Sequence, residues 1–285
     1  MTRNSFHILI FPIFVILVIF QGCSHSRQTT SEEGLAKNIE YLINEGNRLW
    51  AQRNDPEMVT KARTLLTAAY RQQPDDLELS ILLSRIYYFQ SHYLTEDIAI
   101  QDSLYLLGKS IAEDGLRLSL NYELTDSISI QEMVKNTDPT HIGALYWWAA
   151  NFGSYLLTKP VMVRMEHREG FEEILHHMLL INPNYFYGGP YRLFGVLYAR
   201  IPGVDISRAE SYFDQAISAY PDYFASKVLK AQFFYTKAGQ REQFNRALND
   251  IISADPTIIP EVMSENIFEQ KLAKILLAEE SMLFE

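Results

Sequence analysis

Residues 207–221 read SRAESYFDQAISAYP. Within this stretch Ala209, Phe213 and Ala216 are spaced four and then three residues apart, and Pro221 follows five residues later. Spacings of three and four place side chains on one face of an α-helix, whereas a proline cannot continue a helix. The stretch therefore predicts an amphipathic helix that buries one face and ends just before its proline.

The same 4-3-5 spacing occurs twice more, which indicates an internal repeat. The residues concerned are Ala62, Leu66, Ala69 and Pro74, and Phe244, Leu248, Ile251 and Pro256. Pro183, Pro221 and Pro256 are 38 and 35 residues apart, close to the ~34-residue period of the two-helix tetratricopeptide repeat. Strand signals are weak, and there is no Asn-Gly hairpin turn. We predict an all-α fold: a right-handed, solenoid-like array of helical hairpins with cryptic tetratricopeptide-like repeats.

We expect one helical domain over residues 38–285. Its predicted hairpins span 38–74, 76–120, 140–182, 189–221 and 224–256, and a closing helix over 260–284 caps the last repeat. An Asp or Asn precedes a proline at 55–56, 138–139, 182–183 and 255–256, a pair typical of helix starts. Residues 121–138 are the least repeat-like, and a loop is predicted for their polar first half.

The N-terminus predicts export and a lipid anchor. One positive charge, Arg3, precedes an apolar run of about 13 residues, which is shorter than the ~20 that a membrane-spanning helix needs. Gly22-Cys23 then resembles the lipobox of bacterial lipoproteins, although Phe20 stands where that motif usually has Leu. We predict a signal peptide over 1–22, lipidation of Cys23 and a tether over 23–37. The alternative is a transmembrane anchor with an incidental cysteine.

Composition excludes several functional classes. Twenty-five basic and 35 acidic side chains give a net charge of −10, which disfavours binding to nucleic acid. The single cysteine allows no internal disulfide. Glu172 and His176 are one helical turn apart but lack the His-Glu-x-x-His pattern of zinc proteases, and no Gly-x-Ser-x-Gly turn is present. We predict a non-enzyme with no metal site and no cofactor.

Two aromatic clusters carry the functional prediction. The first lies in residues 143–155, where helical geometry would put aromatic side chains on every side. It is either a central core helix or the wall of an apolar ligand cleft with an asparagine as its polar anchor. The candidate ligand or pore residues here are Tyr146, Trp147, Trp148, Asn151, Phe152 and Tyr155.

The second cluster spans residues 185–198 and adds Tyr191, Arg192 and Tyr198 to the candidates. Arg192 would sit in the first turn of a helix, where a cation opposes the helix dipole, so a carboxylate, a backbone carbonyl or a ligand anion should compensate it. A structural turn between repeats is the alternative to ligand contact. The residues predicted to shape the turns are Gly188, Gly189, Pro190, Gly195, Pro202 and Gly203.

Residues 188–203 read GGPYRLFGVLYARIPG and resemble the GGPxRxxGxxYxxxPG signature of the TatT family, as do residues 144–149, ALYWWA. These are the T components of tetratricopeptide-repeat-protein-associated TRAP transporters. The resemblance implies an all-helical lipoprotein that forms a homotrimer and partners the periplasmic substrate-binding P subunit. It also implies an apolar pore or cleft that transfers a hydrophobic small molecule.

We therefore predict a lipid-anchored, periplasm-facing accessory component of a TRAP-type transporter, with Arg192 able to meet a carboxylate head group. Ser24 after the lipidated cysteine favours the periplasmic face of the outer membrane. The alternative is a tetratricopeptide-like scaffold of the cell envelope that binds another protein and no small molecule.

Overall fold

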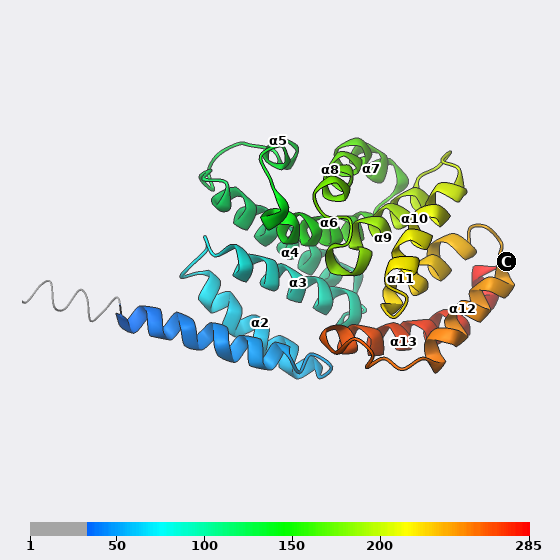
Figure 1. Cartoon of the computed structure of the whole chain (residues 1–285), viewed down its shortest axis with the longest axis horizontal. Helices are drawn as coiled ribbons and strands as arrows, with labels where there is room; N and C mark the ends of the chain where they lie inside the picture. Colours follow the sequence, from blue (N-terminus) through cyan, green and yellow to red (C-terminus); the bar gives the residue numbers. More distant parts are fainter. Residues whose placement is uncertain (1–32) are drawn as a thin grey trace, which may run out of the picture.

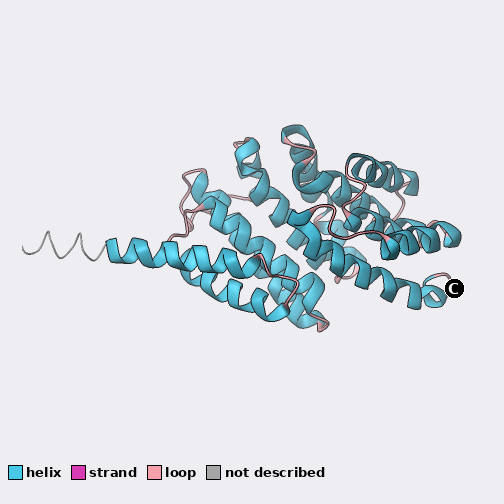
Figure 2. Cartoon of the chain, turned by 60° about the horizontal axis from the view of Figure 1, so that its bottom comes forward, coloured by secondary structure: helices cyan, strands magenta, loops and turns pink. Residues whose placement is uncertain are grey.

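The computed structural model describes residues 33–285, in which every regular element is helical (Figures 1 and 2). The all-α prediction is confirmed. The predicted signal peptide, Cys23 and the first part of the predicted tether lie outside the described residues. The first helix covers residues 33–50, so helical structure begins before the predicted domain start at 38.

The remaining helices follow in chain order. They are α2 (Pro56–Tyr70), α3 (Leu77–Leu94), α4 (Ile98–Ser119), α5 (Ile130–Val134), α6 (Ile142–Leu157), α7 (Val161–Glu166), α8 (Arg168–Ile181), α9 (Tyr185–Arg200), α10 (Ile206–Ala219), α11 (Phe224–Leu229), α12 (Arg241–Ser253), α13 (Met263–Ala278) and α14 (Glu280–Leu283). Short 3₁₀ turns cover Pro139–His141 and Pro260–Val262, and a π-helical segment covers Lys230–Tyr235.

The helix pairs agree with the predicted hairpins to within a few residues. The helix of residues 33–50 packs on α2, and α3 on α4 and α9 on α10 share the most extensive helix contacts. All nine helical residues of the 4-3 pattern are at most 1% exposed, so the repeated spacing marks the buried face of α2, α10 and α12. The solenoid handedness and the likeness to tetratricopeptide repeats stay predictions.

Two of the four predicted proline-marked helix starts are confirmed. Asp55 caps α2 by accepting a hydrogen bond from Glu57 N at 2.9 Å, and Asp138 caps the 3₁₀ turn before α6. The predictions at Asn182 and Asp255 are wrong, because the prolines that follow them lie in turns over residues 183–184 and 256–257 and no helix begins there. Helix α9 begins only at Tyr185 and α13 only at Met263.

Helix α6 is the centre of the fold. It packs against α3, α4, α8 and α9, and every residue from Ile142 to Asn151 is buried. Asn151 donates to the carbonyl of Ser84 at 3.2 Å and to that of Trp147 at 2.8 Å, while Ser84 Oγ donates to the carbonyl of Gly108. These bonds tie α6 to α3 and α4 and hold it in the core of the fold.

Helix α13 contacts both ends of the array. Its Ala273 and Leu276 pack with α12, as expected of a capping helix. Its Phe268 packs instead into the N-terminal cluster, with its ring centroid 5.4 Å from that of Phe89 in α3. Figure 1 shows α13 along the lower edge of the molecule, with its start beside the N-terminal helices and its end toward the C-terminus. The closing helix therefore joins the last hairpin to the first, which the sequence did not predict.

Candidate functional site

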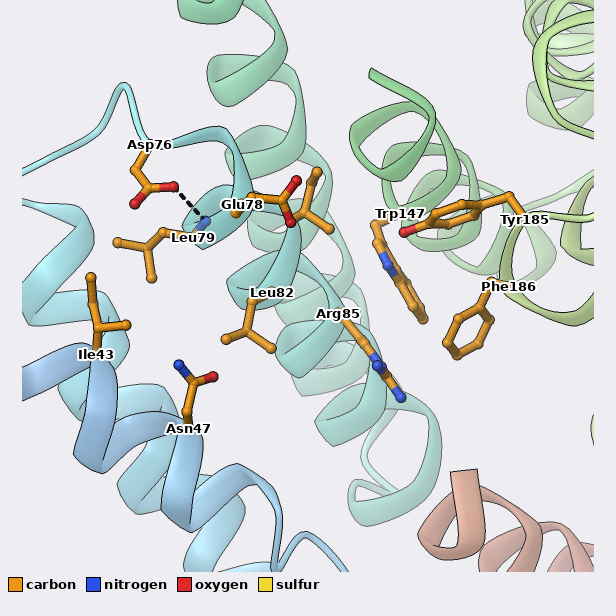
Figure 3. Close-up of a pocket in the computed structure, with 11 residues that line it drawn as sticks. Ile43, Asn47, Asp76, Glu78, Leu79, Leu82, Arg85, Trp147, Tyr185 and Phe186 are labelled. Atoms are coloured by element: carbon orange, nitrogen blue, oxygen red, sulfur yellow. Dashed lines mark hydrogen bonds between the residues drawn. The ribbon is translucent and has the colours of Figure 1, made fainter. Parts of the chain in front are cut away.

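A cavity of about 380 Å³ lies between the helix of residues 33–50, α3, α6 and the start of α9 (Figure 3). We call it the Trp147 pocket. Its aliphatic wall includes Ile43, Leu79 and Leu82, its aromatic wall is Trp147, Tyr185 and Phe186, and its charged groups are Asp76, Glu78 and Arg85. Mostly apolar walls with a few polar groups are typical of small-molecule sites, whose volumes run from about 300 to 1,000 Å³.

The aromatic wall depends on an unusual backbone at the start of α9. Phe186 and Tyr187 have φ values of 45° and 58°, and Gly188 follows at 70°, so the chain turns left-handed before the right-handed helix resumes. For residues with side chains this conformation costs about 1–2 kcal/mol each. The kink brings the Phe186 ring edge-on to that of Trp147, with a centroid distance of 4.8 Å.

Arg192 stabilises this left-handed segment. It is only 3% exposed, and it donates to the backbone carbonyls of Phe186 at 3.2 Å and Tyr187 at 3.1 Å. It also donates to Tyr146 Oη at 2.6 Å and to Ser226 Oγ at 3.2 Å. Of the three compensating groups that the sequence left open for Arg192, backbone carbonyls are the ones the structure provides. Its guanidinium does not line the Trp147 pocket.

Arg85 is the cation of the Trp147 pocket. Its guanidinium carbon lies 4.8 Å from the ring centroid of Phe186 and 5.7 Å from that of Trp147, distances typical of cation–π contacts. One of its amino groups donates to Glu265 of α13 at 2.5 Å. Its Nε is buried and has no hydrogen-bond partner among residues 33–285.

The charge at this end of the pocket is fixed near neutral pH. Burial alone would raise the pKa of the Glu265 carboxyl, but Arg85 and Arg53 outweigh it and hold that pKa below its ordinary value. Burial raises the pKa of the Tyr185 phenol to about 12, so it remains neutral. The carboxylate of Glu265 is therefore ionised and shared between two arginines.

Two other predicted residues belong to a different pocket. Trp148 and Phe152 line a second cavity of about 250 Å³ together with side chains of α4 and α8. Trp148 also donates its indole N–H to Glu113 at 3.0 Å. The sequence predicted one conduit lined by Trp147, Trp148, Phe152 and Tyr191. Trp147 lines the first pocket, whereas Trp148 and Phe152 line the second, because neighbouring residues of α6 point in different directions.

The remaining candidates line neither pocket. Tyr146 and Asn151 are core residues with protein hydrogen bonds, and Tyr198 donates to Glu172 and accepts from Arg208 at 2.8 Å. Tyr155 stacks on Phe152, and Tyr191 lies 6.4 Å from Tyr212, ring centroid to centroid; both are partly buried.

The predicted turn residues lie where α9 meets its neighbours. A Cβ on Gly189 would come within 2.3 Å of the Tyr146 ring, and one on Gly195 within 2.8 Å of the Phe213 ring. Both positions therefore exclude any larger residue unless a ring moves. Pro190 lies in the first turn of the right-handed part of α9, while Pro202 and Gly203 lie in the turn before α10.

A comparison with protein families matches residues 53–284 to TAtT, the TRAP transporter T-component. The chain belongs to this family. The resemblance found in the sequence is confirmed, and the T-component has an accessory role in TRAP transport, which places it at the cell envelope. A search of curated proteins found no match.

Two further structural observations concern membrane-spanning helices and metal-binding groups in the T-component. No helix within residues 33–285 is both long and apolar enough to cross a membrane. Over the same residues, no three His, Cys, Asp or Glu side chains are grouped so that they could hold a metal ion.

Sequence reasoning missed the charged residues of the T-component's pocket. Arg85 is the only Lys or Arg in α3, and with Ser84 it interrupts the apolar and aromatic run over residues 81–89. Glu265 and Glu269 flank Phe268 on α13 and are both buried. A charge on the apolar face of a helix is the signal that could have revealed these residues, because such a charge needs a partner when it is buried.

Proposed function

We propose that this T-component is a lipid-anchored, periplasm-facing subunit that binds the substrate-binding P subunit and holds a hydrophobic small molecule in the Trp147 pocket. The observation that carries the proposal is the pocket itself: about 380 Å³ with one aliphatic and one aromatic wall, beside the family's Gly-Gly-Pro segment. Membership of the TRAP T-component family supports the transport role.

Filling the pocket tests the ligand proposal. Leu82 lines the pocket and is half-buried, so Leu82→Trp should occupy the space without replacing a core residue. Leu180→Trp is the matched control, because Leu180 is 83% exposed and lies outside the pocket. We expect the wild type and the control to yield the same organic compound when the purified protein is extracted and analysed by mass spectrometry. Leu82→Trp should yield less than about a tenth of it.

The same extraction experiment distinguishes ligand binding from the alternative function, a scaffold that binds only another protein. Val161, Met162 and Met165 of α7 are exposed apolar side chains, and Met162 is 76% exposed, which favours a surface that contacts another protein. A pure scaffold would carry no compound in any variant and would still co-purify with its partner. If the wild type yields no compound on extraction and binds no added organic acid, the ligand proposal is overturned and the scaffold function is the one that remains.

The anchor and the assembly belong to the same proposal. Lipidation of Cys23 would hold the chain at the outer membrane, so Cys23→Ala should move the protein from the membrane fraction to the soluble periplasmic fraction. Co-purification with a TRAP substrate-binding P subunit tests the partner, and light scattering of the purified protein tests the homotrimer.

A further inference from the structure

We infer that the Trp147 pocket recognises a monoanionic carboxylate on an apolar body, and that Arg85 binds the carboxylate. The inference rests on the proposed function and adds the chemical class of the ligand. It starts from an imbalance of charge around Arg85, the pocket residue that pairs with Glu265 of α13.

Two arginines share one carboxylate there. Arg53 holds Glu265 through its Nε, at 3.1 Å and 3.2 Å from the two carboxylate oxygens, and through an amino group at 2.7 Å. Arg53 also donates to the backbone carbonyls of Glu261 and Trp50. Because Arg53 already neutralises Glu265, the charge of Arg85 is in excess.

The donors of Arg85 are only partly used. A guanidinium carries five N–H donors, and the hydrogen bond from Arg85 to Glu265 occupies one amino group. Its buried Nε has no partner within the described chain. Contacts with the rings of Phe186 and Trp147 fix the orientation of the guanidinium, so its planar fork is held in place for a planar oxyanion.

The rest of the pocket suits the body of such a ligand. Figure 3 shows the guanidinium beside Phe186, with Leu82 between it and Glu78 along α3. Glu78 is seven residues from Arg85, about 10 Å along the helix at ~1.5 Å per residue. The cation and this carboxylate are thus separated by apolar wall. With the excess positive charge at one end and the carboxylates of Asp76 and Glu78 at the other, the pocket fits a monoanion with an apolar body and opposes a dianionic phosphate.

The full chain titrated with decanoate and with methyl decanoate tests this by calorimetry near pH 7.5. The two probes share an apolar chain and differ in charge. We expect the wild type to bind decanoate at least about tenfold more tightly than the ester. Arg85→Gln should bring the two affinities within about twofold of each other by weakening decanoate alone, since Arg53 still pairs with Glu265 in this variant.

Arg63→Gln is the matched control. Arg63 also carries a buried Nε without a hydrogen-bond partner among the described residues and lies over an aromatic ring, Tyr87, but it does not line the pocket. It should keep the wild-type preference. Equal binding of acid and ester by the wild type, or a preference that survives Arg85→Gln, overturns the carboxylate site and leaves the ligand pocket standing. Binding of neither probe by the wild type overturns both. The comparison of decanoate with methyl decanoate in the wild type tests the proposal even if a variant does not fold.

Discussion

Glu269 is the buried carboxyl that the fold leaves least well paired. It is 1% exposed on α13, where Oε1 accepts a hydrogen bond from Tyr93 at 2.5 Å and Oε2 has no partner among the described residues. Burial raises its pKa to about 7, because the charged form loses its hydration. The attraction of Arg192 lowers that pKa but does not cancel the effect of burial. The repulsion of Glu265 raises the pKa further.

This pKa predicts a pH-dependent stability. The pKa of Glu269 is higher in the folded protein than its ordinary value of ~4.3 in the unfolded chain. The contribution of Glu269 to stability is therefore fully present below pH ~4.3 and is lost as the pH rises through 7. The shift corresponds to roughly 3 kcal/mol. Glu269→Gln keeps the acceptor for Tyr93 and removes the charge. Relative to wild type, its free energy of unfolding in urea should rise by up to that amount at pH 8 and be nearly unchanged at pH 4.5.

The control for this prediction is Glu280→Gln, which changes a partly buried carboxyl whose pKa is lowered by its hydrogen bonds with Arg241 and Asn245. It should not become more stable at pH 8. An effect of Glu269→Gln that is the same at pH 4.5 and pH 8 would contradict a raised pKa.

At the scale of elements, the start of α9 combines strain with a single stabilising residue. Phe186 and Tyr187 are held left-handed, and Arg192 from the next turn bonds both of their carbonyls. The helix thereby presents Phe186 to the Trp147 pocket. An element that would be unstable alone is maintained by one buried cation and its hydrogen bonds.

Arg192→Lys should therefore destabilise the protein despite the conserved charge. One ammonium cannot bond two carbonyls, Tyr146 Oη and Ser226 Oγ with the geometry of the guanidinium. We expect a loss of about 2–4 kcal/mol in the free energy of unfolding, measured by urea titration. The exposed Arg48→Lys, whose partner is Glu45, should leave the urea midpoint almost unchanged. Equal effects of the two changes would contradict this role.

At the scale of the whole molecule, α13 closes the helical array. Glu265 contacts Arg53, 212 residues earlier in the chain, and Phe268 packs against Phe89. The same carboxylate that joins the two ends of the array also stands at the end of the Trp147 pocket, through Arg85. Closure of the fold and the charge of the pocket therefore depend on one residue.

Glu265→Ala should be strongly destabilising, by about 3–5 kcal/mol, because it leaves the buried Arg53 without its carboxylate. Glu280→Ala removes a second glutamate–arginine pair, with Arg241, but that arginine side chain is 55% exposed. This control should shift the urea midpoint only slightly, since exposed ion pairs contribute little. Similar losses in the two variants would show that closure through Glu265 is not what stabilises the fold.

Local patterns were enough to predict the helices and their pairing. The 4-3 spacings identified buried faces in α2, α10 and α12, and Pro190 and Pro202-Gly203 marked where helices begin and end. These signals involve residues close in the chain, where helix geometry alone relates spacing to direction. The same reasoning failed at Asn182 and Asp255, because a capping side chain forms a local turn as readily as a helix start.

Amino-acid order alone determined the all-helical class, the family and the places where aromatic side chains gather. The tertiary structure decided that Trp147 and Trp148 line different pockets, that Arg192 stabilises the backbone, and that Arg85 is the charge facing the Trp147 pocket. The reason is that burial and pairing depend on contacts between distant segments. The partner of Arg85 is 180 residues away on α13, and no periodicity within one helix encodes that distance.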